Sequence, residues 1–289
     1  MADSSSIEYD RHRYIYSKKL RKQVEAGYVK NWHFSPDIYY ENAAIIAAGE
    51  LDVAGIREVL PVVSAEVFDH LSFGREPGTT RYRTTHVCVA HADSLTAALI
   101  IGDACVLSFA NGIIPGGRYR AGGLAQEEDM CRLLPQLYPS LVANSDSYPL
   151  SPDRVLISRD MYAIRQPGSY NLCAKLGSCT VLSAAMPCGL ADRRPKGGWV
   201  GSVWEQRVTL TIRAVLAAAR YTGHANLVLG AFGCGAFGNP ARQVARIFRE
   251  QLESEEFRGA FSCVVFAVID PVGTGNLRPF REEMKLLAL

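Results

Sequence analysis

The chain carries a glycine-rich segment, Gly116-Gly117-Arg118-Tyr119-Arg120-Ala121-Gly122-Gly123-Leu124-Ala125-Gln126-Glu127-Glu128, that ends in two adjacent carboxylates. The apolar run at 104–110 precedes it and predicts a buried strand that brings the segment to one edge of a sheet. Glycine tolerates positive φ and lets a ligand approach the main chain closely. The segment therefore suits a sugar or phosphate docked beside a proton donor. A turn followed by a helix with acids in its first turn is the alternative interpretation.

A second glycine-rich segment follows another expected strand, at 226–231. Gly233-Cys234-Gly235-Ala236-Phe237-Gly238 matches G-x-G-x-x-G and precedes a helix expected at 241–253. The amides of such a loop and the helix N-terminus favour a diphosphate. In isolation the pattern is the Rossmann fingerprint, but only one strand follows, at 263–269, and no acid lies at its end with the required spacing. We therefore expect a phosphate loop of another α/β fold and disfavour an NAD-dependent oxidoreductase.

Cys234, inside this second loop, has two interpretations. As a nucleophile it would need a histidine brought close by the fold, and nothing nearby in the sequence supplies one. We favour packing of a small residue.

The order of elements along the chain predicts an α/β layered domain. Strands are expected at 86–90, 104–110, 155–157, 178–182, 226–231 and 263–269, and helices from Asp93 as a cap, at 125–134, at 203–220 and at 241–253. Prolines at 139, 149, 152 and 167 predict that the rest of 138–178 is irregular. Residues 14–60 are expected to be mainly helical. The partition is an N-terminal helical extension, 1–60, and one domain, 61–289.

Composition narrows the function classes. The 289 residues are 48% hydrophobic and 21% charged, with a net charge of +2, which excludes an overall basic nucleic-acid surface but not a local anion pocket. Eight cysteines without a C-x-x-C pair indicate free thiols rather than a zinc site. The polar N-terminus and the lack of a long apolar run predict a cytoplasmic or nuclear protein with no membrane segment. The basic run 11–22 is interpreted as a solvated helix face rather than a nuclear signal.

With both loops in place, the chain resembles the poly(ADP-ribose) glycohydrolase family, in particular its microbial-type branch. The family signature is three glycines, a short spacer and Gln-Glu-Glu, which 116–118 and 126–128 match except at Arg118. The segments 109–111 and 228–239 also resemble the family, and the similarity runs from about residue 60 to about 282. The resemblance implies a macrodomain-like three-layer α/β/α fold with a mixed central sheet.

The resemblance also implies an ADP-ribosyl glycohydrolase that needs no metal or cofactor. Glu128 would be the catalytic acid at the ribose C1″ bond. Glu127 would supply an adjacent negative charge, which favours a protonated neighbour, and would hold a ribose hydroxyl. Gln126 would position the pair, and Gly116 and Gly117 would offer bare backbone.

Other residues are assigned to the ligand with an alternative for each. Asn111 is a candidate for a ribose hydroxyl or a turn-forming residue. The amides of 233–238 would bind the diphosphate, and Phe237 would cover the ribose or belong to the core. Asp93 would read the adenine or act only as a helix cap.

Three functions stay open from sequence. Because Arg118 replaces a glycine of the family signature, the resemblance leaves three alternatives. The chain could be a glycohydrolase acting on poly(ADP-ribose) or ADP-ribosylated protein, or a hydrolase of single ADP-ribosyl groups with little polymer activity. The third alternative is a reader that binds ADP-ribose without turnover. The expected partners are ADP-ribose, its polymer or modified proteins, with no nucleic acid or membrane, and the expected state is a monomer. The linkage attacked is not specified by the sequence.

Overall fold

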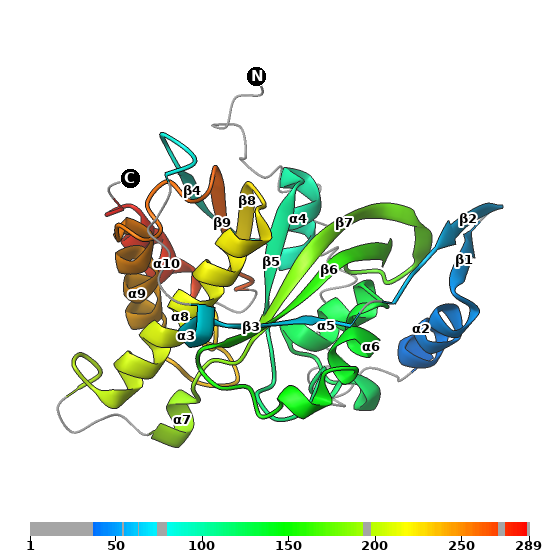
Figure 1. The fold of residues 1–289 in the computed structure, drawn as a ribbon, viewed down its shortest axis with the longest axis horizontal. Helices are drawn as coiled ribbons and strands as arrows, with labels where there is room; N and C mark the ends of the chain where they lie inside the picture. The colour runs from blue at the N-terminus through cyan, green and yellow to red at the C-terminus, as the bar shows by residue number, and fades with distance from the viewer. Residues whose placement is uncertain are drawn as a thin grey trace.

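The structure, a computed structural model, describes residues 37–53, 55–62, 64–73, 80–192, 198–270 and 275–287. Its centre is a seven-stranded mixed sheet with the order β3-β6-β7-β5-β8-β9-β4 (Figure 1). The strands are β3 (Glu66–Asp69), β4 (His86–Ala90), β5 (Ala104–Phe109), β6 (Arg154–Arg165), β7 (Leu172–Ala184), β8 (Asn226–Leu229) and β9 (Cys263–Ala267).

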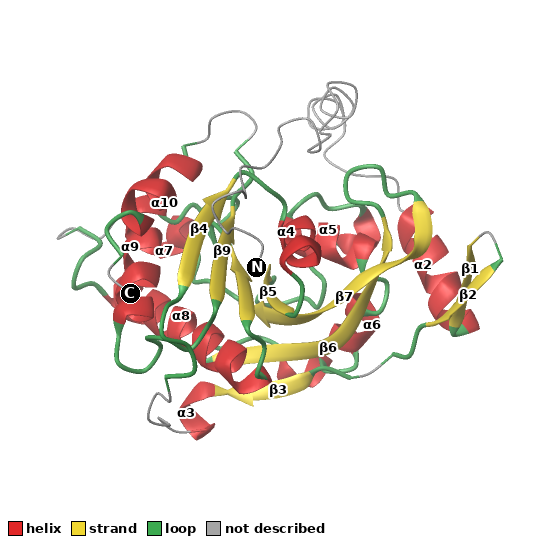
Figure 2. Cartoon of the chain, turned by 90° about the horizontal axis from the view of Figure 1, so that it is seen from above, coloured by secondary structure: helices red, strands yellow, loops and turns green. Residues whose placement is uncertain are grey.

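Helices cover both faces of this sheet (Figure 2). One face packs against α4 (Ser94–Ile101), α5 (Gln126–Leu133) and α6 (Leu137–Val142). The other face packs against α8 (Val203–Thr222), α9 (Ala241–Glu253) and α10 (Leu277–Met284). Shorter elements are α3 (His70–Phe73), α7 (Gly189–Asp192) and the 3₁₀ turns η2 (Tyr119–Ala121) and η3 (Ser145–Ser147). The predicted three-layer α/β/α fold with a mixed central sheet is confirmed.

The directions of the strands explain where the two glycine loops meet. Strands β7, β5, β8, β9 and β4 run parallel to one another, whereas β6 pairs antiparallel with both β3 and β7. The carboxyl ends of parallel strands lie at one edge of a sheet. Since β5 and β8 are adjacent, the loops that follow them leave from neighbouring positions on that edge.

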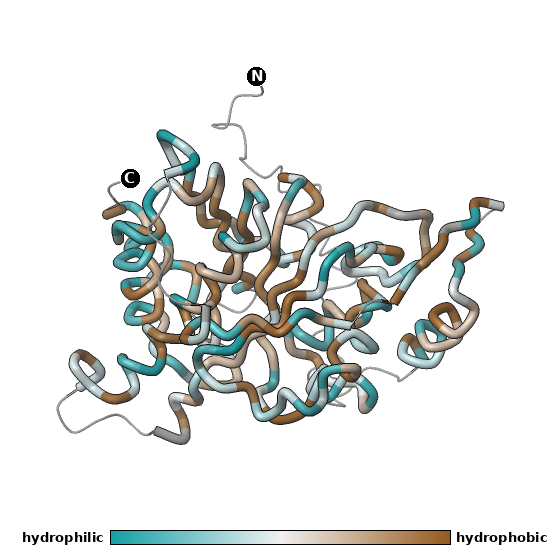
Figure 3. Tube along the Cα trace, viewed as in Figure 1, coloured by the Kyte–Doolittle hydropathy of each residue, from teal (hydrophilic) through white to brown (hydrophobic). Residues whose placement is uncertain are grey.

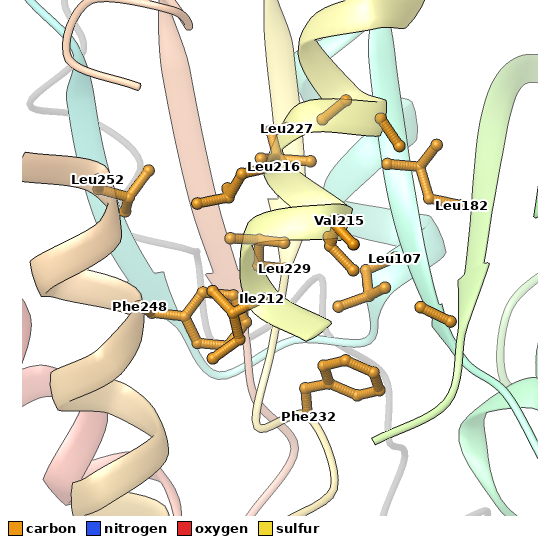
Figure 4. Packing of buried hydrophobic residues seen from close by; sticks show 14 of the residues in the cluster. Leu107, Leu182, Ile212, Val215, Leu216, Leu227, Leu229, Phe232, Phe248 and Leu252 are labelled. Carbon is orange, nitrogen blue, oxygen red and sulfur yellow. The ribbon is translucent and has the colours of Figure 1, made fainter. Parts of the chain in front are cut away.

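The core on the α8 side fixes this arrangement. Ile212, Val215 and Leu216 of α8 pack against Leu227 and Leu229 of β8, with Phe248 of α9 alongside (Figure 4). The helix residues are spaced by three and four and the strand residues by two, as one apolar face of each element requires. The apolar colour in Figure 3 accordingly follows the central strands.

Most of the predicted elements are confirmed, and 138–178 is the main exception. Strands β4, β5, β8 and β9 and helices α4, α5, α8 and α9 lie where the sequence predicted them, with ends that differ by a few residues. The strands expected at 155–157 and 178–182 lie within β6 and β7, but the prediction of irregular structure for the rest of 138–178 is wrong, because β6 and β7 are longer and form an antiparallel hairpin there.

The N-terminal part also differs from expectation. Helix α2 (Asp37–Ala48) is followed by an antiparallel hairpin of β1 (Glu50–Val53) and β2 (Ile56–Val59), so the helical prediction is wrong for 50–59. Residues 1–36, with the basic run 11–22, lie outside the described residues. The partition at residue 60 stays a prediction. Within the described residues, none of the helices has the length and apolar character needed to cross a bilayer.

Candidate active site

The first glycine loop folds over the N-terminus of α5 and is tied to Glu127. The carboxylate of Glu127 accepts the backbone N–H of Asn111 at 2.7 Å through Oε2 and that of Gly116 at 3.1 Å through Oε1. The side chain is only 2% exposed. Because both oxygens of this buried carboxylate accept backbone N–H groups, Glu127 fixes the path of the loop between Asn111 and Gly116.

Glu128 faces the same loop but keeps one oxygen unpartnered. Its Oε1 accepts the backbone N–H of Arg118 at 2.9 Å. Its Oε2 is buried and has no hydrogen-bond partner among the described residues. A buried polar atom left unsatisfied costs about 1–3 kcal/mol, and such atoms in native structures often mark catalytic sites. Glu128 Oε2 is therefore the oxygen of the pair that lacks a hydrogen-bond partner in the described structure.

The glycines are required because the carboxylates occupy the space of their side chains. A Cβ on Gly117 would lie 2.6 Å from Glu128 Oε1 and 3.0 Å from Glu127 Oε2, and φ there is +55°. A Cβ on Gly123 would lie 2.9 Å from Glu128 Oε1. The loop can enclose the pair only where these positions lack side chains.

The departure at Arg118 is explained by backbone geometry. Gly116 and Gly117 have φ of +68° and +55°. Position 118 has φ of −99° and ψ of 23° as the N-cap of η2, a conformation open to any residue. Arg118 therefore replaces a glycine without strain, and its side chain is exposed.

Gln126 and Arg132 hold the loop from α5. Gln126 accepts the Phe109 N–H at 2.8 Å and donates to the Leu107 carbonyl at 2.8 Å, which locks the helix start to β5. This is the positioning role expected for Gln126. Arg132, which sequence reasoning missed, is buried and donates from Nη2 to the carbonyl of Gly123. Its only sequence signal is a cation in the last turn of a helix that begins with three acids.

Burial sets the protonation of the pair. Burial raises the pKa of Glu127 to about 8, with the neighbouring Glu128 adding to the rise and the two backbone donors opposing it. Near neutral pH the Glu127 carboxyl is therefore mainly protonated. This differs from the expectation that Glu127 supplies the negative charge.

Asn111 lies at the start of the loop and serves its geometry. Its Oδ1 accepts the backbone N–H groups of Ile113 at 2.9 Å and Ile114 at 3.0 Å. This is the turn-forming alternative for Asn111. A contact of its amide group with a ribose stays a prediction.

The second glycine loop presents bare amides at the same edge of the sheet. The N–H groups of Gly235, Ala236 and Phe237 have no acceptor within the described part of the chain. Gly235 and Ala236 are exposed and Phe237 is half-buried. Three consecutive donors on a loop before a helix are suited to an anion.

Asn239 and Trp204 shape this loop, and sequence reasoning assigned a role to neither. Asn239 donates from Nδ2 to the carbonyls of Pro187 at 2.8 Å and Gly233 at 3.0 Å. Its Oδ1 accepts the indole N–H of Trp204 at 2.7 Å. Asn239 stands in the quoted motif and could have been noticed as a loop-forming amide, whereas Trp204 gives no local signal.

The remaining positions of the second loop divide into packed and open ones. A Cβ on Gly233 would lie 2.5 Å from Met186, and one on Gly238 would lie 2.6 Å from Leu190, whereas one on Gly235 meets nothing within 4 Å. Cys234 is buried, and burial raises the pKa of its thiol far above the usual range. This fits the packing interpretation of Cys234 and not a nucleophile. Phe237 is half-buried and packs on the core of the α8 side, so its position over the ribose stays a prediction.

Two aromatic rings join the loops beneath the site. Phe109, at the end of β5, lies 5.4 Å from Phe232, just after β8, measured between ring centroids. A Cβ on Gly230 would lie 2.8 Å from the Phe109 ring, so the two loop bases are in direct contact. The bases of the two glycine loops therefore lie side by side.

Asp93 caps α4, as predicted. Its Oδ1 accepts the Thr96 N–H at 2.8 Å and its Oδ2 accepts the Thr96 hydroxyl at 2.7 Å. Burial raises the pKa of Asp93. Burial also raises the pKa of Asp129, beside Glu128 on α5, to about 6, and Asp93 adds to that rise. The adenine contact of Asp93 stays a prediction. No group of three or more His, Cys, Asp or Glu residues in the described ranges is arranged to hold a metal ion.

Comparison with known proteins finds a family model that matches the part of the chain with the carboxylate pair. The family model described as microbial-type PARG, catalytic domain, matches residues 62–164, which include the first glycine loop and the carboxylate pair. A comparison with curated proteins gives no significant match.

Solved structures resemble most of the chain. The poly(ADP-ribose) glycohydrolase of Thermomonospora curvata is 27% identical with a TM-score of 0.75 over 86% of this chain and 98% of its own. The same protein bound to the inhibitor ADP-HPD gives 27% identity and a TM-score of 0.74 over the same shares, 86% and 98%. The enzyme of Deinococcus radiodurans in complex with ADP-ribose is 29% identical with a TM-score of 0.67 over 78% of this chain and 95% of its own. On its family match, its fold and these relatives, the chain is similar to microbial-type poly(ADP-ribose) glycohydrolases.

Proposed function

We propose that this protein is a glycosidase-type hydrolase that cleaves the ribose C1″ glycosidic bond of poly(ADP-ribose) or of ADP-ribosylated protein and releases ADP-ribose. The observation that carries the proposal is the buried Glu127–Glu128 pair, held against backbone amides beside a loop of open N–H donors. A module that only binds ADP-ribose has no need of two adjacent buried carboxyl groups.

Glu128 is the group we assign to protonation of the leaving oxygen. Its Oε2 has no partner in the described structure, whereas both oxygens of Glu127 are engaged by the loop. Because Oε2 is covered in the described structure, substrate must displace the groups over it. The positive charge that develops at C1″ would be stabilised by the carboxylate that Glu128 becomes after it gives up its proton, and by the substrate diphosphate. Water completes the hydrolysis.

The amides of the second loop are the site we propose for the diphosphate. The Deinococcus radiodurans relative was solved with ADP-ribose and the Thermomonospora curvata relative with ADP-HPD. In this chain, the contact between Phe109 and Phe232 joins the base of the amide loop to the strand that precedes the carboxylate loop. One ADP-ribose unit would therefore be anchored by its diphosphate while its distal ribose reaches Glu128.

The wider setting is proposed on separate grounds. All eight cysteines are unpaired thiols, which fits the reducing cytoplasm or nucleus. The partners we propose are ADP-ribose, its polymer and modified proteins, with no direct nucleic-acid or membrane contact. We also propose a monomer, which sedimentation equilibrium would test.

Release of ADP-ribose from automodified polymer tests the proposed activity. The wild-type protein should release ADP-ribose, detected by mass spectrometry, and Glu128→Gln should not. Retention of polymer without release would make the protein a reader. Defined mono- and poly-ADP-ribosylated substrates, run in parallel, would identify the linkage that is cleaved.

A further inference from the structure

Helix α2 buries an amide where an ordinary helix buries apolar residues. Among the described residues of α2, Asn42 is the only fully buried one, with 2% exposure. The helix lies outside the matched family segment, which begins at residue 62. A buried polar side chain is tolerated only when hydrogen-bonded, so its partners indicate its purpose.

The amide nitrogen of Asn42 donates hydrogen bonds to the first glycine loop and to helix α5. Its Nδ2 donates to the hydroxyl of Tyr119 at 3.0 Å, to the carbonyl of Arg132 at 3.0 Å and to that of Cys131 at 3.3 Å. Tyr119 follows Arg118, whose N–H holds Glu128. Arg132 holds the carbonyl of Gly123 at the other end of the loop.

The orientation of the Asn42 amide is fixed from the β6–β7 hairpin. Arg165, 2% exposed, donates from Nε to Asn42 Oδ1 at 2.9 Å, so the amide nitrogen must face the loop. The same guanidinium donates to the Tyr170 carbonyl at 2.9 Å and to Glu41 at 2.8 Å. Tyr170 in turn donates its hydroxyl to Asp129 of α5.

Aromatic packing supports the same loop from behind. The ring centroid of Tyr39 on α2 lies 5.5 Å from that of Tyr119 and 5.9 Å from that of Tyr138. Tyr138 closes the space behind Gly116, where a Cβ would lie 2.6 Å from its ring. Helix α2 therefore contacts both the loop and a ring that limits its movement.

From these contacts we propose that α2 is part of the catalytic unit and that Asn42 is a positioning residue for it. Asn42 fixes Tyr119, and through it the Arg118 N–H, against the helix that carries Glu128. The inference rests on the proposed function for its kinetic consequence, but its structural consequence is independent of substrate. Proton transfer from Glu128 is sensitive to small displacements of its carboxyl group. Loss of the Asn42 contact should therefore lower turnover, and it should leave the more distant diphosphate contacts largely unchanged.

Tyr119→Phe is the sharpest variant. It removes the hydroxyl that accepts from Asn42 and leaves the ring and the two carbonyl contacts of α2 intact. We expect kcat on polymer to fall at least about tenfold while the Kd for ADP-ribose changes less than about threefold. Hydrogen–deuterium exchange of the apo full-length chain should accelerate in peptides spanning 116–123.

Asn42→Asp and Ala44→Ser complete the set. Asp keeps an acceptor for Arg165 but loses the donors to the loop, so it should reproduce the loss in kcat and the faster exchange. Ala44, exposed on α2, is the matched control and should leave both unchanged.

Two results would overturn the inference. One is wild-type kcat with wild-type exchange at 116–123 in Tyr119→Phe. The other is faster exchange confined to α2, which would make Asn42 only an anchor for that helix. If the wild-type protein hydrolyses none of the substrates, the proposed function fails, and exchange alone then decides the role of Asn42.

Discussion

Trp204 donates its indole N–H to Asn239 Oδ1 at 2.7 Å and so fixes the side chain around which the second glycine loop folds. Asn239→Ala removes this acceptor and the donors to Pro187 and Gly233. Since buried groups left unpaired cost about 1–3 kcal/mol each, the variant should unfold at lower denaturant and bind ADP-ribose more weakly. Trp204→Phe removes only one of these bonds, so its losses of stability and of ADP-ribose affinity should be smaller. Chemical denaturation and calorimetry measure the two effects, and equal losses in the two variants would contradict this ordering.

Glu128→Gln should abolish turnover while sparing affinity. The amide keeps the shape of the side chain but cannot donate the proton, and loss of a general acid costs about 100- to 10,000-fold in rate. Calorimetry should find ADP-ribose affinity within a few-fold of wild type. Glu250→Gln on α9 is the control, because its carboxylate pairs with Arg246 away from the site. Wild-type turnover in the Glu128 variant would reject the assignment.

The protonation of Glu127 predicts a pH dependence of stability. Burial raises the pKa of this carboxyl from 4.5 to about 8, so between these values the folded state holds a proton that the unfolded state has lost. The contribution of Glu127 to stability therefore falls as pH rises through this window, and it is most favourable below pH 4.5. Glu127→Gln should flatten this slope in urea unfolding followed across the window. An identical slope in wild type and variant would contradict the raised pKa.

Gly235→Val tests the amide loop as the diphosphate site. A Cβ there meets nothing within 4 Å and φ is not positive, so the fold should tolerate the change and the melting temperature should hold. A branched side chain beside the donors should still exclude phosphate and lower ADP-ribose affinity at least about tenfold. Gly233→Val is the contrasting variant, since its Cβ would lie 2.5 Å from Met186, and it should lose stability. Unchanged affinity in Gly235→Val would place the ligand elsewhere.

Arg118 tests how the chain chooses between polymer and single units. If its exposed side chain occupies the exit used by the next ADP-ribose unit, Arg118→Gly should raise activity on polymer relative to mono-ADP-ribosylated protein. If it instead contacts a phosphate or the leaving group, all activities should fall, because a charge-assisted contact contributes about 1.5–3 kcal/mol. Arg118→Ala, measured in parallel, separates the side chain from any loosening of the loop by glycine. An equal polymer-to-monomer ratio in all three proteins would remove Arg118 from any account of specificity.

Local patterns in the sequence predicted the site, and long-range contacts completed it. The glycines, the carboxylate pair and the cap at Asp93 act within one turn or loop, so their spacing alone carries the signal. Asn42 and Tyr119 are 77 positions apart, and Trp204 and Asn239 are 35 apart. No periodicity relates residues that the fold brings together across such distances.

The sequence predicted only short pieces of β6 and β7, at 155–157 and 178–182, for a related reason. Pro149 and Pro152 lie before β6, and Pro167 lies in the turn that joins it to β7. These prolines delimit the strands instead of interrupting them. The prediction of irregular structure for the rest of the region took prolines that mark the ends of strands as evidence against strands.

The bare amides of the second glycine loop affect how far this site can be redesigned. Substitution replaces side chains, yet every residue except proline keeps its N–H. The donors at 235–237 therefore survive almost any point change, and a substitution such as Gly235→Val can block a ligand by its bulk without removing a donor. Redesign of the loop for a different anion would have to alter the path of its backbone, through Gly233, Gly238 or Asn239, rather than the side chains at 235–237.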